Sequence, residues 1–313
     1  MTDKREPRDG YAEGLLDLGR DHDDVFVLDG DCATPNYTAR FQEAHPDRFF
    51  NIGIAECDIV GTAAGLAAAG KVPFANAYAN FLTGRGFDQV RVSVAYSERK
   101  VVIVGHNAGT SAAQEGATHL PLEDVGLMRA LPNMTVIVPC DAVEMRKAVH
   151  AIYNLPGPVY LRVGKLPVPV VTGPDTPFEI GKAVPLRAGS DVTILTTGCT
   201  ASEALGAAEL LAREGIDAEV IHLHTIKPLD AEAVLDSVRR TGCVVTIEEH
   251  SIIGALGSAV AELLGEHHPA PLERVGTRDV FGLSGTMDEL FDHFGLRAAN
   301  IAEAARRARA RRG

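Results

Sequence analysis

Aromatic residues are scarce in this sequence: tryptophan is absent, and all aromatic residues together make up 5% of the 313 positions. Long apolar runs are also missing, and none approaches the ~20 residues that a membrane-spanning helix requires. The opening MTDKREPRDG is polar and charged, which does not fit a secretion signal. These absences lead us to expect a cytoplasmic protein without a membrane segment.

Cysteine occurs only five times, at Cys32, Cys57, Cys140, Cys199 and Cys243, and no two of these form a C-x-x-C pair. Such wide spacing argues against a disulfide framework and against a zinc site. We therefore predict reduced, mostly buried cysteines and no metal ligands in this chain.

Positive charge is in short supply, since 30 lysines and arginines oppose 42 aspartates and glutamates, for a net charge of -12. This balance disfavours nucleic acid and anionic membranes as partners. The one basic cluster, AARRARARRG, is expected to close a C-terminal helix, where cations suit the helix dipole. P-loop and G-x-G-x-x-G motifs are missing as well, which removes the usual signals of nucleotide binding.

What the sequence does contain is an alternation of apolar strand-like runs with helical patterns. The runs of the first half are VFVL at 25–28, KVVIVG at 100–105, MTVIVP at 134–139 and PVYLRV at 158–163. Four prolines at 166–178 interrupt the alternation, which then resumes with DVTILTTG. We predict an α/β fold with two doubly wound, mainly parallel sheet domains, at 1–168 and 186–313, joined by a linker at 169–185.

Glu56 stands at the head of ECDIVGTAAGLAAAG, a stretch of mostly small apolar residues. On a helix, Val60, Ala63, Ala64 and Ala67 share the stripe that carries Glu56, so we expect its carboxylate to point inward. A buried carboxylate needs a partner or a chemical task, because burial without one costs several kcal/mol. The simpler interpretation is a partly solvent-exposed glutamate whose negative charge interacts favourably with the helix dipole.

Two further stretches come directly after predicted strands, where ligand sites of open α/β sheets lie. ANAYANFLTGRGFDQVR holds Tyr78 and Phe81, which either fill the core or form a shelf for a planar cofactor. GHNAGTSAAQEGATHLPLED holds His106, Glu115 and His119, which either bind a polyhydroxylated ligand or belong to a solvated loop.

In this order the three stretches resemble the pyrimidine-binding half of thiamine-diphosphate enzymes, specifically of the transketolase family. NIGIAE is similar to the family segment with the cofactor-activating glutamate, NFL to its aromatic segment, and EGATHLPLED to its substrate-loop histidine motif. LMRALPNMTVIVPCDAVE is similar to the helix and strand that follow, and HTIKPLD and EEHSIIGALGSAVAE to the family's C-terminal domain. The resemblance therefore covers nearly the whole chain.

The resemblance implies thiamine diphosphate as the cofactor, acting as a thiazolium ylid. It implies that Glu56 hydrogen-bonds the N1′ atom of the aminopyrimidine and favours the imino tautomer that takes the C2 proton. It also implies that Tyr78 and Phe81 surround the pyrimidine with apolar and stacking surface. Glu56 and His119 are thus the expected catalytic residues.

For the substrate, the resemblance places His119 at the donor sugar or its covalent intermediate and His106 in the acceptor channel. Glu115 occupies the position of an acidic residue that contacts a substrate hydroxyl. Arg162, in YLRVGK, matches an arginine that holds the sugar phosphate at the channel mouth, and Arg8 matches a second phosphate-binding arginine.

The resemblance also implies a partner. A complete transketolase has an N-terminal domain with a G-D-G…N segment for Mg2+ and the diphosphate, and DGD at 29–31 does not match that segment. With Met1 as its start, the chain is similar to the C-terminal subunit of a split transketolase. We expect an N-terminal partner subunit that carries most Mg2+ and diphosphate ligands, an α2β2 heterotetramer, and ketol transfer from a ketose phosphate to an aldose phosphate.

Two alternatives stay open from the sequence. One is the β subunit of a 2-oxo acid dehydrogenase or an enzyme resembling deoxyxylulose-phosphate synthase. The other is a catalytically silent assembly module that keeps the fold. EGATHLPLED and YLRVGK favour sugar-phosphate chemistry over the first, and the presence of Glu56, His106 and His119 counts against the second.

Overall fold

A seven-stranded sheet forms the centre of the first domain in the computed structural model, which describes residues 3–312. From one edge to the other its strands are β12 (Thr225–Lys227), β6 (Thr135–Ile137), β7 (Val159–Arg162), β5 (Val102–His106), β4 (Val72–Tyr78), β2 (Val25–Asp29) and β3 (Phe49–Asn51). All neighbours are parallel except β12, which pairs antiparallel with β6. The carboxyl ends of six strands therefore lie along one edge of the sheet.

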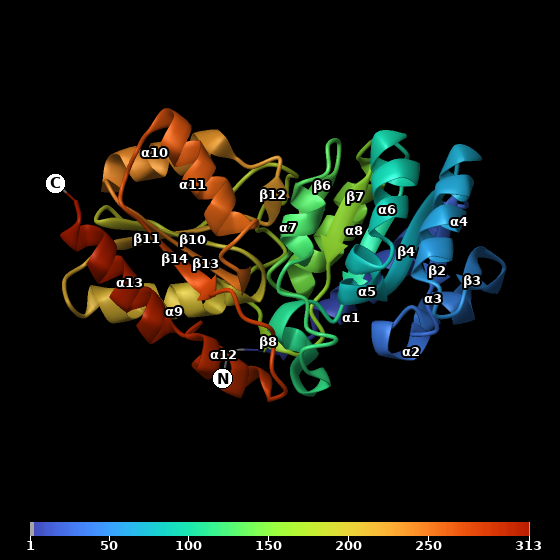
Figure 1. The fold of residues 1–313 in the computed structure, drawn as a ribbon, viewed down its shortest axis with the longest axis horizontal. Helices are drawn as coiled ribbons and strands as arrows, with labels where there is room; N and C mark the ends of the chain where they lie inside the picture. The colour runs from blue at the N-terminus through green and yellow to red at the C-terminus, as the bar shows by residue number, and fades with distance from the viewer. Residues whose placement is uncertain (1–2, 313) are drawn as a thin grey trace.

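Helices cover both faces of this sheet (Figure 1). One face carries α1 (Pro7–Asp21) and α8 (Ala142–Asn154), and the other carries α4 (Glu56–Ala68), α7 (Asp124–Arg129) and the π-helix η2 (Val90–Tyr96). Short helical segments connect them: α2 (Ala33–Asn36), α3 (Ala39–Ala44), η1 (Pro46–Arg48), α5 (Ala79–Gly84), α6 (Phe87–Gln89) and η3 (Gly109–Glu115). The strands are apolar on both sides because both faces are covered.

The second domain is a smaller sheet of five strands. In spatial order these are β14 (Leu272–Thr277), β13 (Val244–Ser251), β10 (Val192–Thr196), β11 (Ala218–His222) and β9 (Val184–Arg187), of which only β9 is antiparallel to its neighbour. Helices α9 (Ala201–Ala212) and α13 (Ala298–Ala310) cover one face, and α10 (Ala231–Thr241) and α11 (Leu256–His267) cover the other. The turn η4 (Gly198–Thr200) precedes α9, and α12 (Met287–Phe294) contacts η3 of the first domain.

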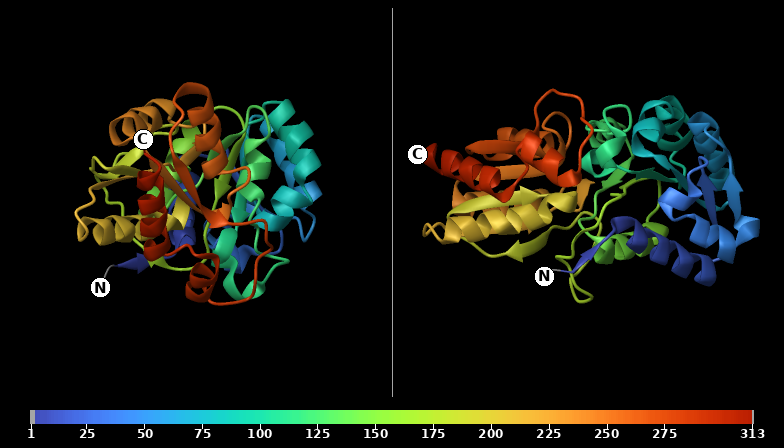
Figure 2. Two further views of the ribbon diagram at one scale, coloured as in Figure 1. Left: turned by 60° about the vertical axis from the view of Figure 1, so that its left-hand side comes forward. Right: turned by 90° about the horizontal axis from the view of Figure 1, so that it is seen from below.

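The two domains lie side by side along the long axis of the molecule (Figure 2). One hydrophobic cluster spans both, because Val136 and Val138 of the first domain belong to the same buried group as Leu195 and Ile221 of the second. A two-stranded sheet of β1 (Lys4–Arg5) and β8 (Val168–Pro169) ties the N-terminal segment to the start of the linker. The packing between the domains is thus a continuous core.

The predicted fold class is confirmed, and the strand-like runs named above coincide with β2, β5, β6, β7 and β10. The basic C-terminal cluster closes helix α13, as predicted. One segment differs from the sequence pattern: the chain leaves the second sheet after His222 and then adds β12 to the first sheet. The division at 1–168, 169–185 and 186–313 stays a prediction. Among residues 3–312, no helix is long and apolar enough to cross a bilayer.

Candidate active site

The candidate site lies at the edge where the parallel strands of the first domain end. Strands β7, β5, β4 and β2 are consecutive neighbours in the sheet, so the segments that follow them meet along this edge. The segment after β4 contains Phe81, the segment after β5 contains Glu115 and His119, and the segment after β7 contains Lys165. This is the position where open α/β sheets bind their ligands.

Glu56 is the first residue of helix α4 and is 3% exposed. Its neighbours Ile59, Val60 and Ala63 are buried on the same stripe, which confirms that the carboxylate faces inward. Its Oε2 atom accepts a hydrogen bond of 2.5 Å from Nη1 of Arg85, whose side chain is half exposed. The helix dipole also favours a negative charge at this position.

An aromatic cluster lies beside this ion pair. The ring centroids of Tyr78 and Phe81 are 6.4 Å apart and nearly parallel, and the His119 ring meets each of them edge-on, at 6.0 Å and 5.0 Å. Arg85 connects the cluster to Glu56, because its guanidinium lies over the Phe81 ring at 5.1 Å. The structure therefore brings together four residues that the sequence named: Glu56, Tyr78, Phe81 and His119.

Glu115 lies close enough to Tyr78 for its charge to act on the phenol. Its carboxylate accepts hydrogen bonds from Nζ of Lys165 at 2.5 Å and from Nδ2 of Asn107 at 3.1 Å. Burial raises the pKa of Tyr78, and the negative charge of Glu115 adds a smaller contribution, so that the pKa reaches about 12. At neutral pH the phenol of Tyr78 is thus protonated and can donate a hydrogen bond, while Glu115 accepts.

Several hydrogen bonds hold the loop that carries His119 in place. Nδ2 of Asn80 donates to the carbonyl of Thr118 at 2.5 Å, and the Thr118 hydroxyl lies 2.8 Å from Nδ1 of His119. The Ser284 hydroxyl of the second domain donates to the carbonyl of Gln114 at 2.5 Å. Both domains therefore position this loop.

His106 lies beneath the site surface and is 1% exposed. Its Nε2 is 2.9 Å from Oδ1 of Asn76, which also accepts from the Tyr11 hydroxyl. Burial, assisted by the charge of Arg8, lowers the pKa of His106 to about 3, so the imidazole is neutral at physiological pH. The structure places His106 in the interior of this chain, where it supports β4 rather than facing an open channel.

Arg162 requires a correction. Its side chain is 4% exposed, with Nε 2.8 Å from Oδ2 of Asp124 and Nη1 3.0 Å from Oε1 of Glu249 in the second domain. Its Nη2 donates to Asp124 and to the backbone carbonyl of Glu249. With its guanidinium taken up by two carboxylates, Arg162 is an interdomain ion-pair residue, and the expected phosphate contact does not fit this geometry.

Arg8 lies in the first turn of helix α1. Its guanidinium donates to Glu6 at 2.8 Å and to the carbonyl of Pro35 at 2.7 Å, and it lies over the Tyr37 ring at 4.3 Å. The side chain is partly exposed. It is therefore held in place without being fully enclosed.

Sequence reasoning missed Arg85, Asn107 and Lys165 as members of the site. All three stand inside or next to stretches that the sequence singled out, FLTGRG, GHNAG and YLRVGK. The available signal was their location after strand ends, where a polar side chain can reach the ligand edge. Arg85 lies 29 residues from its partner Glu56. Asn107 and Lys165 lie 8 and 50 residues from their common partner Glu115, so sequence spacing did not reveal these pairs.

Comparison with known proteins defines the class of this fold and site. Residues 3–170 match the family described as transketolase, pyrimidine binding domain, and residues 181–301 match transketolase, C-terminal domain. The chain therefore belongs to the transketolase family.

Several relatives are separate transketolase subunits. The chain is 47% identical to the 6-deoxy-6-sulfo-D-fructose transketolase subunit SqwH of Clostridium sp. (strain MSTE9), over 95% of this chain and 92% of that protein. It is 38% identical to one of the subunits of the apulose-4-phosphate transketolase of Phocaeicola vulgatus, over 95% and 96%. A solved structure described as a split gene transketolase, inactive beta4 tetramer, superimposes with a TM-score of 0.93 at 44% identity, covering 98% of this chain and 99% of that one.

Proposed function

We propose that this chain is the C-terminal subunit of a split transketolase. It transfers a two-carbon ketol unit from a ketose phosphate to an aldose phosphate with thiamine diphosphate as cofactor. One observation carries the proposal: the buried carboxylate of Glu56 stands beside the aromatic cluster of Tyr78, Phe81 and His119 at the ligand edge of the sheet. The match to split subunits over nearly their whole length supports it.

The residues at this edge fit the pyrimidine half of thiamine diphosphate. A carboxylate removed from water suits a hydrogen bond to a ring nitrogen, and partly exposed aromatic rings suit contact with a planar heterocycle. When bound, thiamine diphosphate would supply a carbon nucleophile for ketol transfer. Glu56 holds a proton at the pyrimidine nitrogen, and Phe81 with Tyr78 excludes water from that contact.

We assign substrate binding to the polar groups around the aromatic cluster. His119 and the protonated Tyr78 phenol offer hydrogen bonds to sugar hydroxyls, and Glu115 accepts from them. Arg8 remains the proposed phosphate contact, since it is a partly exposed cation. The relatives named for apulose 4-phosphate and a sulfofructose, whose substrates carry an anionic group, support an anionic sugar as substrate.

The proposal includes an N-terminal partner subunit that carries the Mg2+ and diphosphate ligands, in an α2β2 heterotetramer in the cytoplasm. Support comes from the relatives described as transketolase subunits and from the tetrameric assembly named for the solved structure. A β-only tetramer described as inactive fits a subunit that needs its partner for activity.

Calorimetry and a coupled ketol-transfer assay test the proposal. The chain alone is expected to bind thiamine diphosphate weakly with Mg2+ and to show no transfer, whereas a mixture with an N-terminal split-transketolase subunit is expected to transfer a two-carbon unit. Tight Mg2+-dependent binding by the chain alone contradicts the split arrangement. Activity of the mixture with 2-oxo acids but with no sugar phosphate contradicts the substrate class.

A further inference from the structure

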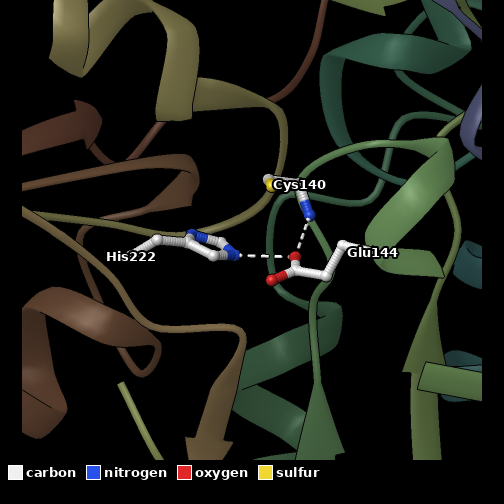
Figure 3. Close-up of side chains that lie close together, drawn as sticks. All are labelled: Cys140, Glu144 and His222. Atoms are coloured by element: carbon white, nitrogen blue, oxygen red, sulfur yellow. Dashed lines mark hydrogen bonds and ion pairs between the residues drawn. The ribbon is translucent and has the colours of Figure 1, made fainter. Parts of the chain in front are cut away.

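A buried cluster outside the candidate active site lies where the two domains meet. Cys140 precedes helix α8, Glu144 stands in the first turn of that helix, and His222 ends β11 of the second domain (Figure 3). The three side chains are at most 2% exposed. Each offers one possible ligand atom, and these atoms lie within 4.8 Å of one another.

The polar groups of this cluster are only partly satisfied. Oε2 of Glu144 accepts from the Cys140 backbone N–H at 2.7 Å and lies 2.8 Å from Nε2 of His222. Oε1 of Glu144 and Nδ1 of His222 are buried and have no hydrogen-bond partner among residues 3–312, and the same is true of Nε2 of the adjacent His224. Because a buried polar atom without a partner is costly, these atoms point to a ligand.

We propose that Cys140, Glu144 and His222 bind a zinc ion that joins the two domains. A set of one thiolate, one imidazole and one carboxylate binds Zn2+ in preference to the harder ions Mg2+ and Ca2+. Ligand atoms of a tetrahedral zinc site lie about 3.3–3.8 Å apart. The more distant ligand atoms, within 4.8 Å of one another, therefore close by about 1.5 Å at most. Glu144 Oε2 and His222 Nε2, now 2.8 Å apart, separate slightly if both bind the ion. The fourth position is open to a water molecule. The site is independent of the proposed transferase function.

Charge balance favours the same ion. On binding, the Cys140 thiol releases its proton to solvent, and His222 binds through the ring nitrogen that carries no proton. The thiolate and the Glu144 carboxylate then neutralise the two positive charges of the ion, so the buried site has no net charge. Two ligands come from the first domain and one from the second, so the ion links the domains across their interface.

The test uses the full chain with any affinity tag removed. We expect elemental analysis to find one zinc ion per chain after desalting, and Co2+ exchange to produce the near-ultraviolet charge-transfer band of a thiolate ligand. We also expect added Zn2+ to raise the melting temperature, since an ion that binds only the folded state stabilises it. A chain that retains no zinc, or whose Co2+ form lacks the thiolate band, overturns the proposal without any variant.

Cys140→Ser removes one ligand with little change in volume, and Cys243→Ser is the matched control because that thiol is also buried but lies outside the cluster. We expect Cys140→Ser to weaken zinc binding by at least ~10-fold, because even the loss of a group that only orients a metal ligand costs about that much. Cys243→Ser should bind zinc as the unchanged chain does. His222→Asn should show the same loss. Equal zinc retention by Cys140→Ser and Cys243→Ser contradicts the assignment.

Discussion

The guanidinium of Arg85 donates to the Glu56 carboxylate at 2.5 Å and at the same time covers the Phe81 ring at 5.1 Å. One side chain thus fixes the orientation of the proposed cofactor-activating carboxylate and links it to the aromatic cluster. Because Arg85 is half exposed, its ion pair contributes little to stability, about 0–1 kcal/mol. Its importance lies in positioning.

For Arg85→Gln we therefore expect a melting temperature close to that of the unchanged chain but a loss of activity of about tenfold or more in the assembled enzyme, because misplaced catalytic groups reduce rates strongly. Arg85→Lys keeps the charge and should recover part of the activity. Thermal unfolding and steady-state kinetics on both variants distinguish these effects. A large stability loss with unchanged kcat means that Arg85 is purely structural.

Replacing Glu56 by glutamine should leave assembly intact and lower activity by ~10²-fold or more, on the scale of acid–base catalysis. The amide has nearly the same shape but cannot take up or share a proton at the pyrimidine nitrogen. Hydrogen exchange at the C2 position of bound thiamine diphosphate measures this step directly. Exchange in Glu56→Gln at the unmutated rate would falsify the role of Glu56.

His119→Ala should impair donor turnover more than cofactor binding. The imidazole is proposed to contact substrate hydroxyls that are ordered only late in the reaction, so kcat for the ketose donor falls while the Kd of the cofactor changes little. Asn80→Ala is a useful comparison, because it releases the loop that carries His119 without removing the imidazole. Unchanged kinetics of His119→Ala with every donor tested would exclude the proposed contact.

Removal of Arg162 is expected to unfold the interdomain junction rather than alter phosphate recognition. Arg162→Ala leaves Asp124 and Glu249 buried and unpaired, which costs about 3–5 kcal/mol of unfolding free energy. Burial by itself would raise the pKa of Asp124, but the ion pair with Arg162 outweighs this and holds it below its usual value. A melting curve checks the stability loss. Selective loss of activity toward phosphorylated acceptors, with normal stability, contradicts this assignment.

A pH dependence follows from His106. Burial lowers its pKa from 6.5 to about 3 in the folded chain, so between these values the unfolded state binds a proton that the folded state does not. Its contribution to stability is therefore fully present above pH 6.5 and declines by about 1.4 kcal/mol per pH unit as the pH falls toward 3. Chemical denaturation of the unchanged chain and His106→Asn between pH 4 and 7 measures the difference in slope, with the exposed His267→Asn as control. Identical slopes in all three would contradict the prediction.

The sequence alone determined the fold class, the helix that begins at Glu56 and the family resemblance. Local patterns were sufficient here, because strand runs such as 158–163 are continuous apolar segments and the stripe of Val60 and Ala63 repeats with the helical period. The pairing of Tyr78 and Phe81 could also be anticipated, since Tyr78 is the last residue of β4 and Phe81 lies three positions further on, in α5.

Only the tertiary structure decided what each charged residue pairs with. Arg162 matched a phosphate-binding arginine in the sequence, yet Glu249 reaches it from the second domain, 87 residues away. The link of Arg85 to Glu56 and the cluster of Cys140, Glu144 and His222 arise in the same way, from segments that sheet order and domain packing bring together. A pattern of a few residues encodes the period and burial of one element, but a side-chain partner depends on which elements meet, and that is set by the packing of the whole chain.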